Sequence, residues 1–393
     1  MTVTEVQEPQ GFTIHTAPVG LADDGRDDLT VLLSTTPATV SAVFTKSRFA
    51  GPSVTLSREA AADLRARGVV VLARNANVAT GTLGEQNARE VCALAAQATG
   101  VPEGELLIAS TGVIGRQYPM DGIREHLKSL TPPFGGQGFG HAAHAIMTTD
   151  TRPKIASRRI GDATLTGIAK GVGMMEPDMA TLLTFFATDA RLDPQEQDRV
   201  FRRVMDRTFN AVSIDTDTST SDTAALFANG QAGDVAPYDF EQALHEVALS
   251  LVKDIARDGE GASKLIEVRV SGARDDAQAK RVAKSVVNSP LVKTAVHGGD
   301  PNWGRIAMAI GKCSDDADID QNDVTIRFGD TAVYPPHTTD TAAEESLLAT
   351  VAEHMRGDEV VISVDLGIAR GSFTAYGCDL TNEYIRLNAH YTT

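Results

Sequence analysis

Thr181 stands where a polar, glycine-flanked loop meets a strongly apolar segment. The stretch KGVGMMEPDMATLLTFF runs from Lys170 through Ala180 and Thr181 into the apolar run LLTFF. That run predicts a buried strand, so Thr181 would occupy the first strand position, directly after the loop. A threonine hydroxyl placed there is either an ordinary turn residue or a nucleophile.

A nucleophilic threonine needs a base, because a free hydroxyl reacts poorly. In the immediate neighbourhood the sequence offers the acids Glu176 and Asp178 and no histidine. Cutting the chain before Thr181 would provide a base within the same residue. The new α-amino group has a reference pKa of about 7.7–8.0, against ~10.4 for a lysine side chain. The pattern by itself leaves both interpretations open.

The segment STGVIG, from Ser110 to Gly115, is a second candidate for chemistry. It follows a predicted short strand at residues 106–109, and its small residues leave backbone N–H groups exposed. Such groups can stabilise a developing oxyanion. Most Ser-Thr-Gly turns are only turns, so this pattern gains weight only together with a nucleophile.

Other catalytic and metal signatures fail. The sequence has no G-x-S-x-G elbow, and its glycine–lysine pair is followed by Cys313 where a phosphate loop needs Ser or Thr. His141 and His144 lack a neighbouring ligand set, which favours surface histidines over a metal site. The run DTDTSTSDT, from Asp215, lacks the sixth-position glycine and the final glutamate of a calcium loop, so we interpret it as a hydrogen-bonded polar turn.

Composition and charge narrow the class of protein. The net charge of −16 argues against binding nucleic acid or an anionic membrane, both of which need a basic surface. Three widely spaced cysteines predict neither a disulfide framework nor a zinc motif. The N-terminus has no signal-peptide pattern, and no apolar run approaches the ~20 residues of a membrane span. We therefore expect a cytoplasmic protein.

The elements that must position these residues alternate between strand and helix. Strands are predicted at residues 29–34, 39–44, 69–73, 106–109, 265–270 and 324–328, and from the closing runs VVISVD, SFTAYG and EYIRLN. Helices are predicted after a cap at Ser57, at about 84–99, 194–208 and 239–257, and after a capping box of Thr341 and Glu344. Residues 131–140 are the most linker-like piece. These elements predict sheets covered by helices.

Nearly the whole chain resembles the ornithine acetyltransferases, also called glutamate N-acetyltransferases. KGVGMMEPDMAT resembles the self-cleaving segment of that family. Further motifs fall in the family's order: AVFTKS at Ala42, STGVIG at Ser110, AIMTTDT at Ala145, DTSTSDT at Asp217, GEGASK at Gly259, NSPLVKTA at Asn288, GDPNWGRI at Gly299 and the C-terminal YIRLNAHYTT. A match over so many motifs is highly specific.

The resemblance implies an α+β fold. The expected form is a layered α-β-β-α sandwich similar to the N-terminal-nucleophile hydrolases but with its own connectivity, plus a smaller α/β part at about residues 240–340. It also implies self-cleavage between Ala180 and Thr181. The α fragment (1–180) and the β fragment (181–393) would stay together, and two such pairs would associate as α2β2.

The implied reaction is acetyl transfer from N-acetylornithine to glutamate through an acetyl-enzyme, with no metal or organic cofactor. The resemblance makes Thr181 the nucleophile. Thr111 and Gly112 would form the oxyanion hole, through a hydroxyl and a backbone N–H. Lys170 would bind substrate and assist cleavage.

The same resemblance outlines an amino-acid pocket. Glu260, in GEGASK, would face the amino groups of the substrate. Thr148, which Thr149 could replace, would contribute from AIMTTDT. Asn388 and Thr393, the latter with its terminal carboxylate, would complete the pocket.

Several positions depart from the family's usual residues. Glu176 and Asp178 stand where Ala and Asn are more common, Arg74 and Thr216 replace glycines, and Ser221 replaces Asn. The nucleophile and the oxyanion residues are unchanged. The departures therefore bear on substrate preference, and on whether the chain serves arginine biosynthesis or a specialised pathway, more than on reaction type.

Two classes of function remain open. The first is the acetyltransferase, and the second is an amidase or hydrolase that uses the same acyl-Thr181 with water as acceptor. A non-enzymatic scaffold is disfavoured because Thr111, Gly112, Lys170 and Thr181 are all present. The acceptor dependence of deacylation separates the first two.

Overall fold

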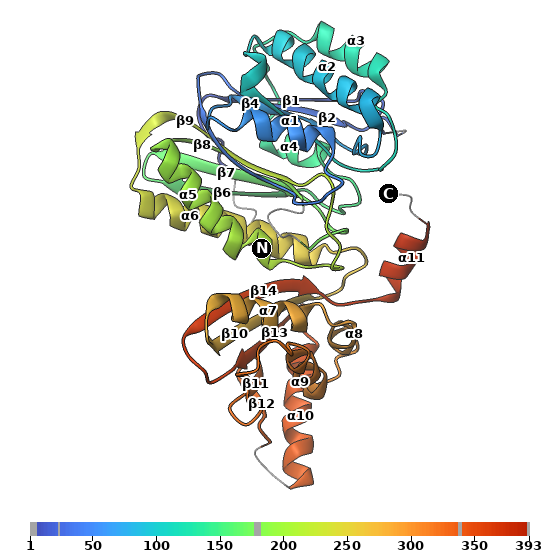
Figure 1. The fold of residues 1–393 in the computed structure, drawn as a ribbon, viewed down its shortest axis with the longest axis vertical. Helices are drawn as coiled ribbons and strands as arrows, with labels where there is room; N and C mark the ends of the chain where they lie inside the picture. Colours follow the sequence, from blue (N-terminus) through green and yellow to red (C-terminus); the bar gives the residue numbers. More distant parts are fainter. Residues whose placement is uncertain (1–5, 23, 177–181, 337–339, 391–393) are drawn as a thin grey trace. The chain divides into compact units, whose positions relative to one another are not determined.

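The structure is a computed structural model that describes residues 6–22, 24–176, 182–336 and 340–390. Contacts within the chain define two compact units (Figure 1). Residues 1–210 and 217–251 belong to the first unit, and residues 211–216 and 252–391 to the second. Of the helices within the described ranges, none has the length and apolarity needed to cross a membrane.

The first unit contains two sheets of mixed parallel and antiparallel strands. One has the order β1–β2–β4–β5, with β1 (Phe12–Ala17), β2 (Leu29–Ser34), β4 (Gly68–Leu72) and β5 (Leu106–Ser110). The other has the order β3–β9–β8–β7–β6, with β3 (Thr39–Phe44), β9 (Thr223–Asp234), β8 (Leu183–Arg191), β7 (Ala163–Lys170) and β6 (Lys154–Ile160).

Helices cover the outer face of each sheet (Figure 1). On the first sheet, α2 (Gly81–Thr99) and α3 (Met120–Ser129) share one apolar cluster with the strands. On the second sheet, Phe201 of α5 (Pro194–Arg207) meets Phe186 of β8 with ring centroids 6.2 Å apart. Leu251 of α6 (Pro237–Arg257) lies against Gly167 of β7. The predicted layered α+β fold is confirmed.

Two short helices contact strands of both sheets. The helix α4 (Phe139–Ala145) contacts β1 and β2 of one sheet and β6 and β7 of the other. The helix α1 (Pro52–Ala60) contacts β5 and β3 in the same way. Short 3-10 turns, η1 (Glu103–Glu105) and η2 (Phe209–Ala211), precede β5 and follow α5.

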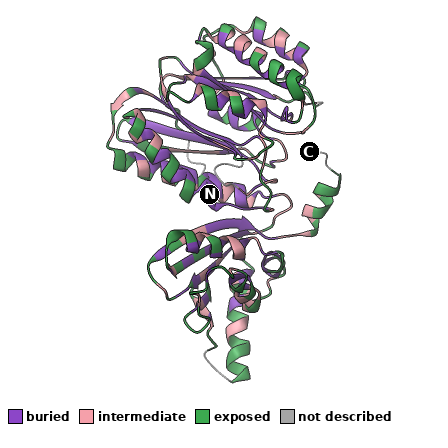
Figure 2. Cartoon of the chain, viewed as in Figure 1, coloured by how far each residue is buried: buried purple, intermediate pink, exposed green. Residues whose placement is uncertain are grey.

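The apolar run of β4 is continuous because both faces of its sheet are covered. Val69 and Val71 join the cluster between the sheets, whereas Val70 and Leu72 join the cluster under α2 and α3. Successive strand residues point to opposite faces, so a strand buried on both sides shows no polar alternation. Figure 2 shows these strands buried and the outer helices exposed on one side.

Several predicted helix ends agree with the structure. The Asp193 carboxylate caps α5 by accepting from the N–H groups of Gln195 and Glu196 at 3.1 and 3.0 Å, with Pro194 in the first turn. Gly100 ends α2 in the left-handed conformation, with φ 68°. The cap of α10 (Thr341–Met355) is Asp340, one residue before the predicted Thr341.

The prediction of a helix cap at Ser57 is wrong. The helix α1 begins at Pro52, a residue suited to a first turn because its missing N–H is not needed there. Ser57 lies inside the helix, where Oγ donates to the Ile108 carbonyl at 2.6 Å and accepts from the Ile108 N–H at 2.7 Å. Its hydroxyl thus satisfies backbone groups on β5, an edge strand.

Residues 131–140 do not separate domains, contrary to their linker-like composition. They lie within the first unit. The Gln137 side chain accepts from the Thr16 N–H at 2.7 Å and donates to the Thr16 carbonyl at 3.2 Å, and Phe139 is 1% exposed. These contacts tie the segment to β1 and bury its end in the core between the sheets.

The second unit is built on one sheet with the order β12–β11–β13–β10–β14. Its strands are β12 (Thr331–Tyr334), β11 (Thr325–Phe328), β13 (Glu359–Asp365), β10 (Leu265–Ala273) and β14 (Gly371–Cys378). Its helices are α10 and α7 (Asp276–Val287), α8 (Pro290–Gly298), α9 (Trp303–Gly311) and α11 (Asn382–His390). The helix α7 packs on β10 and β14.

The C-terminal run EYIRLN is helical, so its predicted strand is wrong. It forms most of α11, which Thr381 caps by accepting from the Glu383 N–H at 3.1 Å. Its partly buried residues are Glu383, Tyr384 and Leu387, and the others are exposed. The short apolar alternation suited a strand equally well, and the cap decides for the helix.

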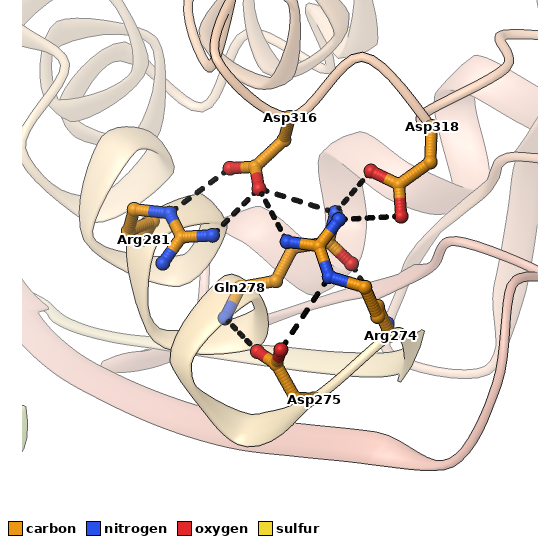
Figure 3. Close-up of polar contacts among 6 residues, drawn as sticks. All are labelled: Arg274, Asp275, Gln278, Arg281, Asp316 and Asp318. Carbon is orange, nitrogen blue, oxygen red and sulfur yellow. Dashed lines mark hydrogen bonds and ion pairs between the residues drawn. The ribbon is translucent and has the colours of Figure 1, made fainter.

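A network of charged side chains fastens the start of α7 to the loop after α9 (Figure 3). Asp316, with 3% of its side chain exposed, accepts two hydrogen bonds from the Arg281 guanidinium, at 2.6 and 3.0 Å. Arg274 and Gln278 donate to the same carboxylate at 3.1 and 3.3 Å. The hydrogen bonds from Arg281, followed by those from Arg274, lower the pKa of Asp316 to about 2.

Asp316→Asn should destabilise the protein at neutral pH by about 1–3 kcal/mol, the usual effect of removing hydrogen bonds to a charged group. The lowered pKa means that the stabilisation is present above the unfolded-state pKa of about 3.9 and is lost as the pH falls toward about 2. Urea unfolding between pH 7 and pH 3 should show the gap to wild type closing below pH 4. Asp318→Asn, at a 34% exposed side chain, is the matched control and should have a smaller effect. A gap that does not change with pH would contradict the assignment.

Candidate active site

The turn after β5 holds Thr111 and Gly112 against the segment that follows β4. Thr111 donates its N–H to the Leu72 carbonyl at 3.1 Å, and Val113 donates to the Arg74 carbonyl at 3.2 Å. Gly112 has φ 129°, and a Cβ there would lie 2.1 Å from the Arg74 carbonyl carbon. Only glycine fits this close approach.

The two residues that replace family-typical glycines have a left-handed backbone conformation. Arg74 has φ 72° and Thr216 has φ 71°, both in the left-handed region. A residue with a side chain is strained there by roughly 1–2 kcal/mol relative to the right-handed region, which explains why glycine is the usual residue. Arg74 also borders Gly112, so this strain lies directly beside the predicted oxyanion turn.

Lys170 and Thr111, 59 residues apart in sequence, meet in the first unit. Lys170 ends β7, and its Nζ donates to Thr111 Oγ1 at 3.3 Å, with both residues at most 9% exposed. An ammonium can only donate, so the Thr111 oxygen must accept, and its hydroxyl hydrogen remains for another acceptor. Among the residues that the structure describes, no acceptor is found for the Gly112 N–H. This arrangement can place two donors at one oxygen.

Asp150 lies beside the predicted substrate residues and was missed by sequence reasoning. Its Oδ2 accepts from the Thr148 N–H at 3.2 Å, and its Oδ1 accepts from the Gly171 N–H at 2.9 Å. Burial acts to raise the pKa of Asp150, but the charges of Lys170 and Lys154 and the hydrogen bonds to the carboxylate outweigh it and lower the pKa. An acid within the motif AIMTTDT was the available signal.

The predicted cleavage residues Ala180 and Thr181, and Thr393, lie outside the described residues. The structure does describe residues on either side of the predicted cleavage segment. Lys170 of β7 is the register partner of Leu183 of β8, and Leu182 is the residue directly after Thr181. The Leu182 Cβ lies 3.2 Å from where a Cβ on Gly171 would be.

Hydrogen bonds join the polar run DTDTSTSDT to the segments that contain Glu176 and Thr45. The Glu176 N–H donates to the Asp217 carbonyl at 2.7 Å, and Thr45 Oγ1 donates to the Ser219 carbonyl at 2.7 Å. These contacts agree with its interpretation as a hydrogen-bonded turn. Within the described residues, no three His, Cys, Asp or Glu side chains lie together so that they could hold a metal ion, and His141 and His144 are exposed on α4.

The remaining predicted pocket residues, Glu260 and Asn388, meet in the second unit. Asn388 of α11 donates Nδ2 to the Glu260 carboxylate at 2.8 Å and to the Tyr384 carbonyl at 3.1 Å. Tyr384 Oη donates to Asp215 at 3.4 Å, and Thr381 Oγ1 donates to the Gly261 carbonyl at 2.7 Å. The helix α11 is thereby joined to the GEGASK segment.

Asp379 holds the other end of that segment and is a second residue that sequence reasoning missed. Its carboxylate accepts from the Ser263 N–H and Oγ at 2.8 and 2.5 Å, from the Lys264 N–H at 2.9 Å and from His297 Nδ1 at 2.9 Å. Burial acts to raise the pKa of Asp379, but these hydrogen bonds outweigh it and lower the pKa. The segment that carries Glu260 is thus fixed on both sides.

Comparison with known proteins identifies the family. Residues 13–393 match the ArgJ family, and the chain belongs to it. It is 75% identical to the protein named glutamate N-acetyltransferase Oat2 of Streptomyces clavuligerus, over 100% of both chains. It is 55% identical to the protein named arginine biosynthesis bifunctional protein ArgJ of Rhodococcoides fascians, over 98% of this chain and 94% of that one.

Two solved structures are also similar. One is an arginine biosynthesis bifunctional protein ArgJ from Bacillus halodurans, with 40% identity, a TM-score of 0.47, and coverage of 52% of this chain and 96% of that chain. The other is ornithine acetyltransferase complexed with ornithine from Mycobacterium tuberculosis, with 30% identity, a TM-score of 0.42, and coverage of 44% and 94%.

Proposed function

We propose that this chain is a glutamate N-acetyltransferase that moves the acetyl group of N-acetylornithine to glutamate. Its family and its 75% identical relative, named for that activity, support the reaction. The observation that carries the mechanism is the contact between Lys170 and Thr111, which leaves the Thr111 hydroxyl and the Gly112 N–H as paired donors. Arginine-type biosynthesis is the corresponding pathway, as the name of the second relative indicates for that protein.

The nucleophile in this proposal is Thr181, freed by self-cleavage after Ala180. The new α-amino group serves as the base for the neighbouring hydroxyl. The register pairing of Lys170 with Leu183, two residues after Thr181, supports a nucleophile close to Lys170, since two residues span at most about 7 Å.

Cleavage at this position would leave the fragments joined by their shared sheet. The strand β7 of the α fragment pairs with β8 of the β fragment, and β3 of the α fragment pairs with β9 of the β fragment. Separating the fragments would expose the central strands of one core. We propose that the fragments therefore stay associated, and that two such pairs form α2β2.

In the first half-reaction, the Thr181 amine takes the hydroxyl proton while Oγ attacks the acetyl carbon of N-acetylornithine. The Thr111 hydroxyl and the Gly112 N–H stabilise the oxyanion. The C–N bond then breaks, the proton passes to the departing nitrogen, and ornithine leaves an acetyl ester on Thr181. This sequence uses no metal and no organic cofactor.

In the second half-reaction, the amine of glutamate attacks the ester carbon and Thr181 Oγ departs with a proton, which gives N-acetylglutamate. Lys170 binds the substrate carboxylate, because an ammonium pairs well with it, and Thr148 contributes to the amino-acid pocket. Glu260 binds the amino groups of the substrate, and Asn388 and Thr393 complete the amino-acid pocket. We also propose a cytoplasmic site of action, since Cys92, Cys313 and Cys378 are all free thiols.

The acyl-enzyme can be tested by mass spectrometry. Incubation with N-acetylornithine alone should add about 42 Da to the fragment 181–393, the mass of an acetyl group on an activated nucleophile. Adding glutamate should remove the label and yield N-acetylglutamate. Initial rates with both substrates varied should give parallel double-reciprocal lines.

The same experiment distinguishes the hydrolase alternative. A labelled fragment that water discharges, and that glutamate does not, would retain Thr181 as nucleophile and overturn the transferase assignment. Intersecting reciprocal lines without any labelled fragment would contradict the acyl-enzyme itself.

A further inference from the structure

The carboxylate of Asp150 lies where segments of the candidate site meet. Asp150 belongs to the turn between α4 and β6, and its side chain has no exposed surface. Its Oδ1 accepts from Lys154 Nζ at 2.7 Å and from the Gly171 N–H at 2.9 Å, and its Oδ2 accepts from the Thr148 N–H at 3.2 Å. One buried carboxylate therefore joins the Thr148 segment to the end of β7.

Two lysines bring positive charge into this poorly hydrated region. Lys154 is 1% exposed and Lys170 is 8% exposed. A buried ammonium is costly without a nearby negative charge. Of the effects that lower the pKa of Asp150, the charge of Lys170 is the largest, so this carboxylate is ionised and acts on Lys170 as well as on Lys154.

The position of Lys170 matters for Thr111 as well as for substrate. Lys170 donates to Thr111 Oγ1 and so determines where the hydroxyl hydrogen points. Displacement of a positioning group by about 1 Å can slow a reaction by ~10²-fold. A residue that fixes Lys170 can therefore affect turnover without touching substrate.

We propose that Asp150 is a positioning residue for acetyl transfer. Its carboxylate holds the Lys170 ammonium, and the backbone at Thr148 and Gly171, in the geometry that receives the substrate carboxylate. This inference rests on the proposed function. Lys154 has a different role. Its ammonium pairs with the buried Asp150 carboxylate and stabilises the fold.

The test compares Asp150→Asn, Lys154→Met and the double variant. Both single changes break the same buried ion pair, so both should lower the Tm. The double variant should recover part of the loss seen in Asp150→Asn, because it no longer buries a Lys154 ammonium that has lost the negative charge beside it. It also keeps the test available if Asp150→Asn folds poorly.

The kinetic constants should separate Asp150 from Lys154, although the Tm does not. The KM for glutamate should rise roughly 10- to 10²-fold in Asp150→Asn and in the double variant, since the carboxylate contact of Lys170 is made in the ground state and the transition state alike. The kcat should also fall, by a smaller factor, because Lys170 then orients Thr111 less well. Lys154→Met should stay within about threefold of wild type. Stability would then depend on both residues of the ion pair, whereas the KM for glutamate would depend on Asp150 alone.

A wild-type KM in the double variant, or an equal rise in Lys154→Met, would overturn the positioning role and leave Asp150 as a structural partner of Lys154. Absence of acetyl transfer by wild type in the same assay would instead overturn the proposed function, and this inference with it. The two failures are thereby distinguishable.

Discussion

Thr181→Ala should purify as one uncut chain and lose acetyl transfer by on the order of 10⁶-fold, the loss observed when the nucleophile is removed from a covalent mechanism. The reason is twofold. The variant has no hydroxyl to attack the preceding peptide carbonyl, and no hydroxyl to carry the acetyl group. Denaturing electrophoresis and intact mass should show residues 1–180 and 181–393 as separate fragments only for wild type.

Thr181→Ser is the matched control, because it keeps both the hydroxyl and, after cleavage, the α-amino base. It should be cleaved and should accept the acetyl label, with a rate reduced less than that of Thr181→Ala. A wild-type protein that is fully active as a single uncut chain would show that the amine-base mechanism is wrong.

Thr111→Ala should lower kcat by about 10²–10³-fold with a smaller effect on KM, since an oxyanion donor acts mainly in the transition state. The structure gives a specific reason for a large effect. Lys170 Nζ lies 3.3 Å from Thr111 Oγ1 and occupies the oxygen as an acceptor, which directs the hydroxyl hydrogen elsewhere. Steady-state kinetics in which each substrate is varied at a saturating concentration of the other separates the effect on kcat from the effect on KM.

Thr111→Ser retains the hydroxyl and should recover most of the lost kcat. The Gly112 N–H remains in both variants, so the loss of kcat in Thr111→Ala measures the contribution of the Thr111 hydroxyl, one of the two donors. A loss confined to KM, with kcat unchanged, would make Thr111 a substrate-binding residue and remove it from the oxyanion hole.

Local signals in the sequence determined much of the fold. Asp193 and Pro194 start α5 and Gly100 ends α2, because a cap and a left-handed glycine act within one turn of chain. The apolar run of β4 identified a strand buried on both faces. Where two local outcomes were close in energy, as for EYIRLN, the cap at Thr381 decided for the helix.

The sequence likewise supplied the types of residue that acetyl transfer needs, and their resemblance to a family supplied roles. It could not supply the pairs that form across long separations. Lys170 and Thr111 are 59 residues apart, and Glu260 and Asn388 are 128 apart. No periodicity encodes such contacts, because they depend on how sheets and loops are stacked.

Asp150 illustrates the same limit most clearly. In sequence it is one acid among 52 acidic residues, and its place in the motif AIMTTDT does not show that it is buried. Only the packing of α4, β6 and β7 removes it from water and surrounds it with Lys154, the Gly171 N–H and the charge of Lys170. Burial and neighbouring charge, which the tertiary structure alone determines, make that carboxylate part of the candidate site.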